Sequence, residues 1–197
     1  QPYMEIWLNE VMSLAYLSYY FILPVSVFYL VFKREWETLE RLTLTVGLTF
    51  YLCYLIFIFF PIAGPRFYLN DIYYLPMIGP FFTDIAISVV QGGGLFGGAM
   101  PSSHCAVALV VALVMGKRFK GAKFILSFFL LIVCAGTIYG RYHYVSDVVV
   151  GLLIGGLVNV LTNRWQNSFL TKMNDKRRNS IPAESDSLLV TDEDYGR

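Results

Sequence analysis

The chain has 197 residues, of which 56% are hydrophobic and only 15% are charged. Its mean hydropathy is +0.57, well above that of ordinary soluble domains. The apolar residues come in long uninterrupted stretches rather than alternating or amphipathic ones, which excludes a single soluble core and predicts a membrane protein. The three cysteines, Cys53, Cys105 and Cys134, are widely spaced within these stretches and form neither a disulfide nor a zinc pattern.

The first two predicted membrane helices cover residues 6–32 and 42–62. In the first of them, Pro24 is expected to cause a kink, because proline cannot donate to the helical ladder. A short turn, KREWETLER, leads into the second helix. No charged residue occurs from Leu42 to Pro65, a run of 24 residues, whereas about 20 helical residues cross a bilayer.

Residues 63–100 are rich in glycine, proline and aromatics, and they predict a long outer segment. Within it, FFTDIAISVVQ predicts a short interfacial helix, and GGGLFGG at 92–98 predicts either a flexible hinge or a backbone that closely approaches its neighbours. Three further membrane helices are predicted at 101–116, 124–140 and 148–163. The first of them begins at Pro101, because proline is favoured in the first turn of a helix.

The predicted fold class is therefore all-α: a polytopic membrane bundle with five spanning helices in this chain. The predicted domains are a membrane-embedded region, 1–165, and a polar cytoplasmic tail, 166–197, which we expect to be largely disordered beyond about 181. Five spans place Gln1 outside. Either the chain begins there or another helix precedes it, and the absence of an initiating methionine favours the second alternative.

The distribution of positive charge predicts the orientation in the membrane. With five spans, Arg66 and Arg141 face one side, which leaves 13 of the 15 lysines and arginines on the other. Because basic residues favour the cytoplasmic side, the predicted C-terminus is cytoplasmic. Both histidines, His104 and His143, fall on the non-cytoplasmic side.

Three outer segments carry unusual polar residues: GPRFY (64–68), PSSH (101–104) and GRYHYVSD (140–147). Each has an ordinary explanation on its own. Arg66 could bind a lipid phosphate, Ser102 and Ser103 could cap a helix, and His143 could be a hydrogen-bonded helix-end residue. Together these explanations weaken, because ionisable groups at a membrane edge are costly and both histidines and both outer arginines lie on one side.

The same residues suit phosphoryl transfer. A helix that begins with PSSH offers free backbone N–H groups to an anion, and arginine forks clamp phosphate oxygens. His143 and Asp147 are four residues apart and share a helix face, so the carboxylate can orient the imidazole as a nucleophile. His104 can protonate the departing oxygen as a general acid. No cluster of carboxylates suggests a metal site.

PSSH followed by H-x-x-x-D on neighbouring membrane helices resembles the type 2 phosphatidic acid phosphatase superfamily, over roughly residues 60–160. The motifs of that family are K-x6-R-P, P-S-G-H and S-R-x5-H-x3-D, and its members have six helices. The resemblance implies His143 as nucleophile, Asp147 as its orienting partner and His104 as general acid. Arg66 and the backbone of 102–104 would then hold the phosphate.

The chain departs from these motifs at several positions. Phe59 and Phe67 stand where the family has lysine and proline, and Ser103 stands where it has glycine. Gly136 and Thr137 replace the family's Ser-Arg pair. Arg141 would substitute for that arginine only if the helix has ended before it. The pattern GPRFY, PSSH, YGRYHYVSD is closer to the branch of inositolphosphorylceramide synthases and related phosphotransferases.

Three functions stay open on these grounds. The first is a metal-independent lipid phosphatase that acts through a phosphohistidine on a phosphate ester or pyrophosphate. The second is a lipid phosphotransferase with an alcohol acceptor, and the third is a non-catalytic phospholipid-binding membrane protein. The expected partners are a lipid phosphate substrate and membrane lipids, with no cofactor, no metal and no nucleic acid; the sequence does not fix the oligomeric state.

Overall fold

The computed structural model describes residues 5–69, 77–94 and 96–179, so the tail beyond 181, which we expected to be disordered, lies outside the described residues. The chain divides into two units, residues 1–160 and 161–197. The first unit contains every candidate site residue. Because the regular secondary structure of the described residues is helical apart from one isolated bridge between Ile62 and Gly98, the predicted all-α fold class is confirmed.

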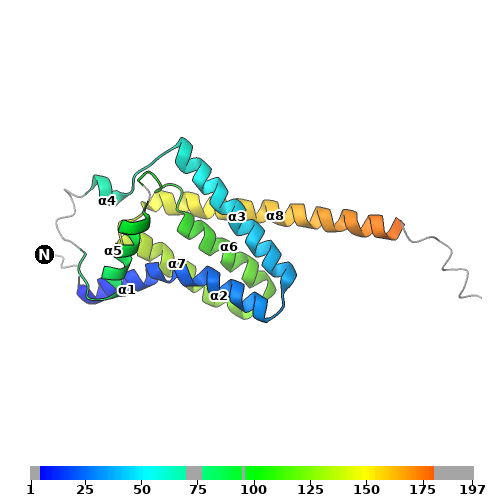
Figure 1. Ribbon diagram of the computed structural model, residues 1–197, viewed down its shortest axis with the longest axis horizontal. Helices are drawn as coiled ribbons and strands as arrows, with labels where there is room; N and C mark the ends of the chain where they lie inside the picture. Colours follow the sequence, from blue (N-terminus) through cyan, green and yellow to red (C-terminus); the bar gives the residue numbers. More distant parts are fainter. Residues whose placement is uncertain (1–4, 70–76, 95, 180–197) are drawn as a thin grey trace, which may run out of the picture. The chain divides into compact units, whose positions relative to one another are not determined.

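The helices follow one another along the chain as Figure 1 shows. Their bounds are α1 Ile6–Leu17, α2 Tyr19–Phe32, α3 Trp36–Phe59, α4 Pro65–Tyr68, α5 Phe82–Gly93, α6 Ser103–Arg118, α7 Lys120–Tyr139 and α8 Val145–Asn179. Among the described residues, four stretches are long and apolar enough to cross a membrane: Ile6–Phe32, Trp36–Phe59, Lys120–Tyr139 and Val145–Ser168. The fifth predicted span corresponds to α6, which has 16 residues and is shorter than the other four.

Helix α6 occupies the centre of the first unit, where it contacts α2, α3 and α7 (Figure 1). It is apolar on all sides, the pattern expected of a helix surrounded by other helices. Its buried residues are Cys105, Ala106, Val107, Ala108, Val110, Val111, Ala112, Val114 and Met115. The hydrophobic core therefore lies around α6, and its N-terminus is fixed in position.

Three glycines allow two pairs of helix backbones to approach closely, as is common between membrane helices. Gly151 and Gly155, one turn apart on α8, pack against the backbone of α6 at Ser102 and Ala106. On α7, Gly136 meets α1, where an added Cβ would lie 2.8 Å from the carbonyl oxygen of Met12. Larger side chains at these positions would force the helices apart.

Two element boundaries in the first half differ from the prediction. The first membrane stretch is interrupted at Ser18, whereas Pro24 lies inside α2. The Ser18 hydroxyl donates to the carbonyl oxygen of Ala15 over 2.6 Å, a local bond that competes with the helical ladder. Helix α3 begins at Trp36 and takes in most of the expected turn, because Glu37 in its first turn complements the helix dipole.

In the second half, α6 begins at Ser103, not at Pro101. Ser102 is the N-cap and its hydroxyl oxygen accepts the N–H of Cys105 over 3.5 Å, while Pro101 precedes the cap in a cis peptide bond. Helix α8 extends to Asn179, well beyond the expected end of the last span. The predicted helix within FFTDIAISVVQ is present as α5.

Candidate active site

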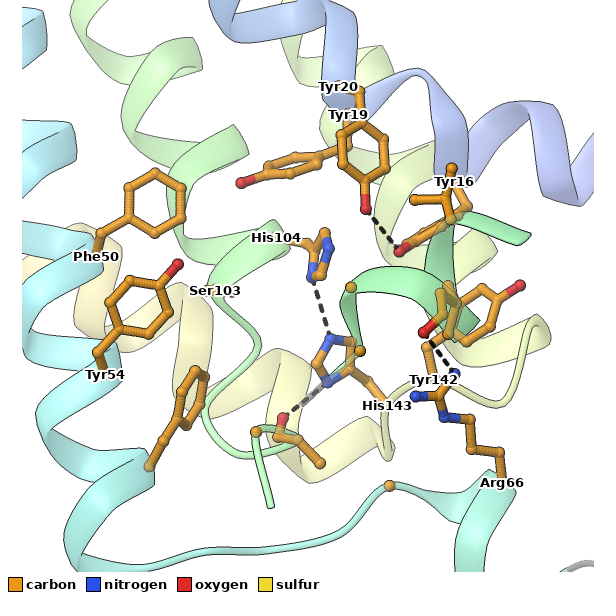
Figure 2. A pocket seen from close by; sticks show the side chains of 18 of the residues that line it. Tyr16, Tyr19, Tyr20, Phe50, Tyr54, Arg66, Ser103, His104, Tyr142 and His143 are labelled. Carbon is orange, nitrogen blue, oxygen red and sulfur yellow. Dashed lines mark hydrogen bonds between the residues drawn. The ribbon is translucent and has the colours of Figure 1, made fainter. Parts of the chain in front are cut away.

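A cavity of about 560 Å³ brings the two histidines together. Its walls come from α1 to α5, the segment between α5 and α6, the first turn of α6 and the turn that precedes α8. Figure 2 shows the rings of His104 and His143 facing each other, with tyrosines from α1 and α2 on one side and Arg66 on another. Side chains that are 39 residues apart in the sequence therefore share one site, as the sequence predicted.

His143 is buried and held by the backbone. Its Nδ1 lies 2.7 Å from the carbonyl oxygen of Ala99. A carbonyl oxygen only accepts hydrogen bonds, so the neutral ring carries its proton on Nδ1 and leaves a lone pair on Nε2. A short parallel bridge fixes Ala99, whose N–H donates to Ile62 over 2.9 Å. The Nε2 lone pair is directed into the cavity, toward His104 (Figure 2).

His104 meets that nitrogen directly. Its Nδ1 lies 3.3 Å from Nε2 of His143, so one proton is shared between the two atoms. Three tyrosine rings surround the imidazole, with centroid distances of 4.6 Å for Tyr19, 5.5 Å for Tyr16 and 6.3 Å for Tyr20. The hydrogen bond and these rings together restrict the ring of His104.

Asp147 is buried at the start of α8, but it is not the nearest partner of His143. Its Oδ2 lies 3.7 Å from Nδ1 of His143, beyond hydrogen-bond distance, and accepts the N–H of Tyr144 over 2.7 Å instead. This is the capping arrangement in which the third helical residue satisfies the N-cap amide. Asp147 therefore fixes the helix start, and it supplies negative charge close to the ring.

Arg66 reaches the same cavity from α4. Its Nη1 donates to the carbonyl oxygen of Val90 over 3.5 Å, and its guanidinium lies 4.6 Å from the ring centroid of Phe67. The backbone also ties the two predicted arginines together, since the N–H of Arg66 donates to the carbonyl of Arg141 over 3.2 Å. Arg66 is the charged side chain that accompanies the histidines in this cavity.

The remaining predicted residues divide between two places. Ser103 lines the main cavity, whereas Ser102 is fully buried and acts as the helix cap. Arg141 lines a neighbouring cavity of about 200 Å³, which shares Arg66, Val90 and Tyr142 with the main one. Arg141 follows the end of α7 and has a left-handed backbone conformation with φ of 58°. The helix has therefore ended before Arg141, as its substitution for the family arginine requires. Its side chain nevertheless does not line the cavity of the histidines.

Several lining residues were not predicted from the sequence. Tyr16, Tyr19 and Tyr20 are spaced i, i+3 and i+4, a pattern that places them on one helix face and could have identified them. Tyr142 packs against Tyr16 with ring centroids 4.5 Å apart. Burial raises the pKa of Tyr142 to about 12, against the opposing effect of the Arg66 charge, so the phenol is neutral. The carbonyl of Ala99 carries no signal in the sequence.

The geometry joins a nucleophilic nitrogen, a proton donor and a guanidinium in one cavity, within a bundle of helices suited to a membrane. Within the described residues, no group of three His, Cys, Asp or Glu side chains could hold a metal ion. These features define a helical membrane protein with a candidate active site in this cavity.

Comparison with known proteins agrees with this class. A family model of the PAP2 superfamily matches residues 3–161, and the chain belongs to that superfamily. The protein is similar to a PA-phosphatase related-family protein of Dictyostelium discoideum, with 22% identity over 166 residues. That match covers 73% of this chain and 30% of the relative, so the chain spans less than a third of the relative's length. No solved structure matches the chain significantly.

Proposed function

We propose that the protein is a lipid phosphatase that hydrolyses a phosphate ester or pyrophosphate of a membrane lipid through a phosphohistidine. The observation that carries the proposal is the 3.3 Å contact between Nε2 of His143 and Nδ1 of His104 in a cavity that also contains Arg66. Membership of the PAP2 superfamily supports phosphatase-type chemistry in general.

The first step forms a bond from Nε2 of His143 to phosphorus while the bond from phosphorus to the lipid oxygen breaks. His104 gives its Nδ1 proton to that leaving oxygen. Arg66 neutralises the charge on the equatorial oxygens. In the second step water attacks phosphorus, His104 accepts a proton from the water, and the nitrogen–phosphorus bond breaks. Substrate must first separate the two rings, because phosphorus in line with Nε2 needs the space that His104 occupies.

Two groups stabilise the charge that the nucleophile acquires. Once Nε2 of His143 is bonded to phosphorus, the ring bears a positive charge and its Nδ1–H still donates to Ala99. Asp147, at 3.7 Å, then interacts with that charge across a buried space where screening is weak. Asp147 thus acts on the charged ring more than on the neutral one.

The test is phosphate release from a panel of lipid phosphates by purified protein in excess EDTA, together with a search for the intermediate. We expect turnover in EDTA, inhibition by orthovanadate, and a base-stable, acid-labile phosphoryl group on Nε2 of His143. An absolute metal requirement would contradict this mechanism. Binding of lipid phosphates without any turnover would instead support a non-catalytic binding protein.

A phosphotransferase is the second candidate, and the wall of Tyr16, Tyr19 and Tyr20 beside His104 favours it. An alcohol held against these rings would deliver its proton to His104 in place of water. Product identification with and without inositol or glycerol distinguishes the two reactions. A product that contains the acceptor identifies transfer, whereas free phosphate alone identifies hydrolysis.

The proposed location of the site is the non-cytoplasmic face of the membrane, with the C-terminus in the cytoplasm. The support is the charge distribution, in which Arg66 and Arg141 are separated from the other 13 basic residues. Membrane-impermeant labelling of a single cysteine introduced near each end of α6 tests this orientation.

A further inference from the structure

A polar strip on α1 binds the start of α5. Asn9 Nδ2 donates to the carbonyl oxygen of Ile78 over 2.8 Å, and Ser13 Oγ donates to Thr83 Oγ1 over 3.3 Å. Asn9, Ser13 and Thr83 are all buried. These contacts join segments about 70 residues apart and fix where α5 begins on the surface of α1.

Glu10 is the central residue of this strip. Its carboxylate accepts three backbone N–H groups, from Phe81 over 3.3 Å, from Phe82 over 2.8 Å and from Thr83 over 3.1 Å. The N-terminal amides of a helix have no partner within the helix, and α5 has no side-chain cap of its own. Glu10 therefore caps α5 from a different helix, and its negative charge faces the positive end of the α5 dipole.

The chemistry of this cap requires a carboxylate. An ionisable residue within a membrane-spanning stretch is costly and indicates a role beyond packing. Glutamine at residue 10 would keep one acceptor oxygen and would turn an NH₂ group toward amides that also donate. The three amides could then not all be satisfied.

The other end of α5 forms a wall of the phosphate cavity and holds Arg66. The carbonyl of Val90 accepts Nη1 of Arg66, and Gly94 packs so closely on Nη2 that a Cβ atom would collide with it. Val89, Val90, Gly93 and Gly94 all line the cavity. Because α5 has 12 residues and behaves as a short rigid element, a shift at its capped end is transmitted to the guanidinium.

We propose that Glu10 is a positioning residue of the active site. By capping α5 it holds the last turn of that helix against Arg66, and so it sets how tightly the cavity binds a phosphoryl group. This inference rests on the proposed function, since it assigns to Arg66 the contact with phosphate. Glu10 itself does not line the cavity.

A purely structural cap would behave differently from a positioning residue. Loss of a structural cap lowers the fraction of folded protein, which lowers apparent kcat and leaves KM and inhibitor affinity unchanged. Loss of a positioning residue weakens binding of phosphate analogues by protein that is still folded. The split between these parameters is therefore the decisive readout.

The experiment compares Glu10→Gln with the wild type, using KM for a short-chain lipid phosphate and inhibition by orthovanadate. We expect KM and the vanadate inhibition constant to rise on the order of tenfold, since a misplacement well away from the reacting atoms can cost up to about 100-fold. Glu10→Asp, which keeps the carboxylate, should recover part of that loss. Asp84→Asn, which removes an exposed carboxylate from the first turn of the same helix, is the matched control and should change neither value.

A double-mutant comparison makes the test specific to Arg66. Lysine lacks the fork whose Nη1 donates to Val90 and whose Nη2 faces Gly94, so in an Arg66→Lys background Glu10→Gln should add less than about twofold. Fully additive effects, or a fall in kcat with an unchanged vanadate constant, would overturn the inference. If Glu10→Gln does not fold, Glu10→Asp must show the same non-additivity. A wild type that neither turns over nor binds vanadate would overturn the proposed function instead.

Discussion

The two histidines and Arg66 are held in the cavity by different means. The histidines lie where α6 and α8 meet, and there the N–H of Ser102 donates to the backbone carbonyl of Asp147 over 2.9 Å. Arg66 is instead held by contacts of its side chain with α5 and with Phe67. The two imidazoles are thus built on close-packed helix ends, whereas the guanidinium that we propose binds phosphate depends on its side-chain contacts with α5 and Phe67. Chemistry and affinity should respond to different substitutions.

The largest effect should come from the nucleophile. His143→Ala removes the only proposed acceptor of phosphorus, and we expect turnover to fall on the order of 10⁴-fold or more, as when other catalytic nucleophiles are removed. Phosphate release and the phosphoenzyme should both disappear while the protein remains folded. Tyr144→Phe, next in the chain, is the control. Substantial residual turnover in His143→Ala would assign the nucleophile to another residue.

Substitutions of Arg66 and Arg141 should have clearly different effects on activity, although both residues lie on the outer side in the sequence-based topology. Arg66→Ala should lower kcat/KM by about 10²-fold or more, because it removes a preorganised donor to the phosphoryl oxygens. Arg141→Ala should cost less than about tenfold, because its side chain lines the neighbouring cavity. Equal losses in the two variants would show that both guanidinium groups contact the phosphate. Steady-state kinetics on one substrate decides between these outcomes.

The close packing of α8 on α6 can be tested with neighbouring glycines. An added Cβ at Gly155 would lie 2.5 Å from the carbonyl oxygen of Ala106, whereas nothing lies within 4 Å of one at Gly156. Gly155→Ala should therefore destabilise the protein by about 1–3 kcal/mol, the typical cost of overpacking. Thermal unfolding in detergent measures the difference, and Gly156→Ala should match the wild type. Equal stability of the two variants would contradict the close contact.

The smallest effect should come from Ser102, which caps α6 without lining the cavity. Ser102→Ala should cost about 1 kcal/mol of stability, the usual value of an N-cap, and leave kcat within about threefold. Unfolding and turnover measured on the same preparation give both numbers. A large loss of turnover with unchanged stability would assign the Ser102 hydroxyl to phosphate binding.

The fold was largely predictable from the sequence, because long apolar runs have few solutions in a membrane. The residues at which the helices begin and end were harder to predict. Helix α3 begins earlier than expected since charged residues such as Glu37 are compatible with a first helical turn. The break at Ser18 depends on a local hydroxyl bond that hydropathy does not register. The length of an apolar run thus identifies a membrane helix better than it identifies the ends of that helix.

The candidate site was predictable where side chains carry the chemistry, and less so where the backbone does. His104, His143 and Arg66 come together as their motifs indicated. The carbonyl of Ala99 takes the hydrogen bond expected of Asp147, and no residue type marks such an acceptor. Glu10 was not singled out, because its partners are amides about 70 residues away.

The hairpin of α6 and α7 has a practical consequence for experiments on this protein. Its turn at Phe119 lies 16 helical residues from the first residue of α6, about 24 Å along the axis. Because this distance separates the turn from the hydrogen bond between Ser102 and Asp147, chain added next to Phe119 should leave that bond in place, provided the Phe119 ring keeps its contact with Tyr29. A fluorescent reporter or an epitope inserted there should therefore monitor folding or sidedness without disturbing the cavity.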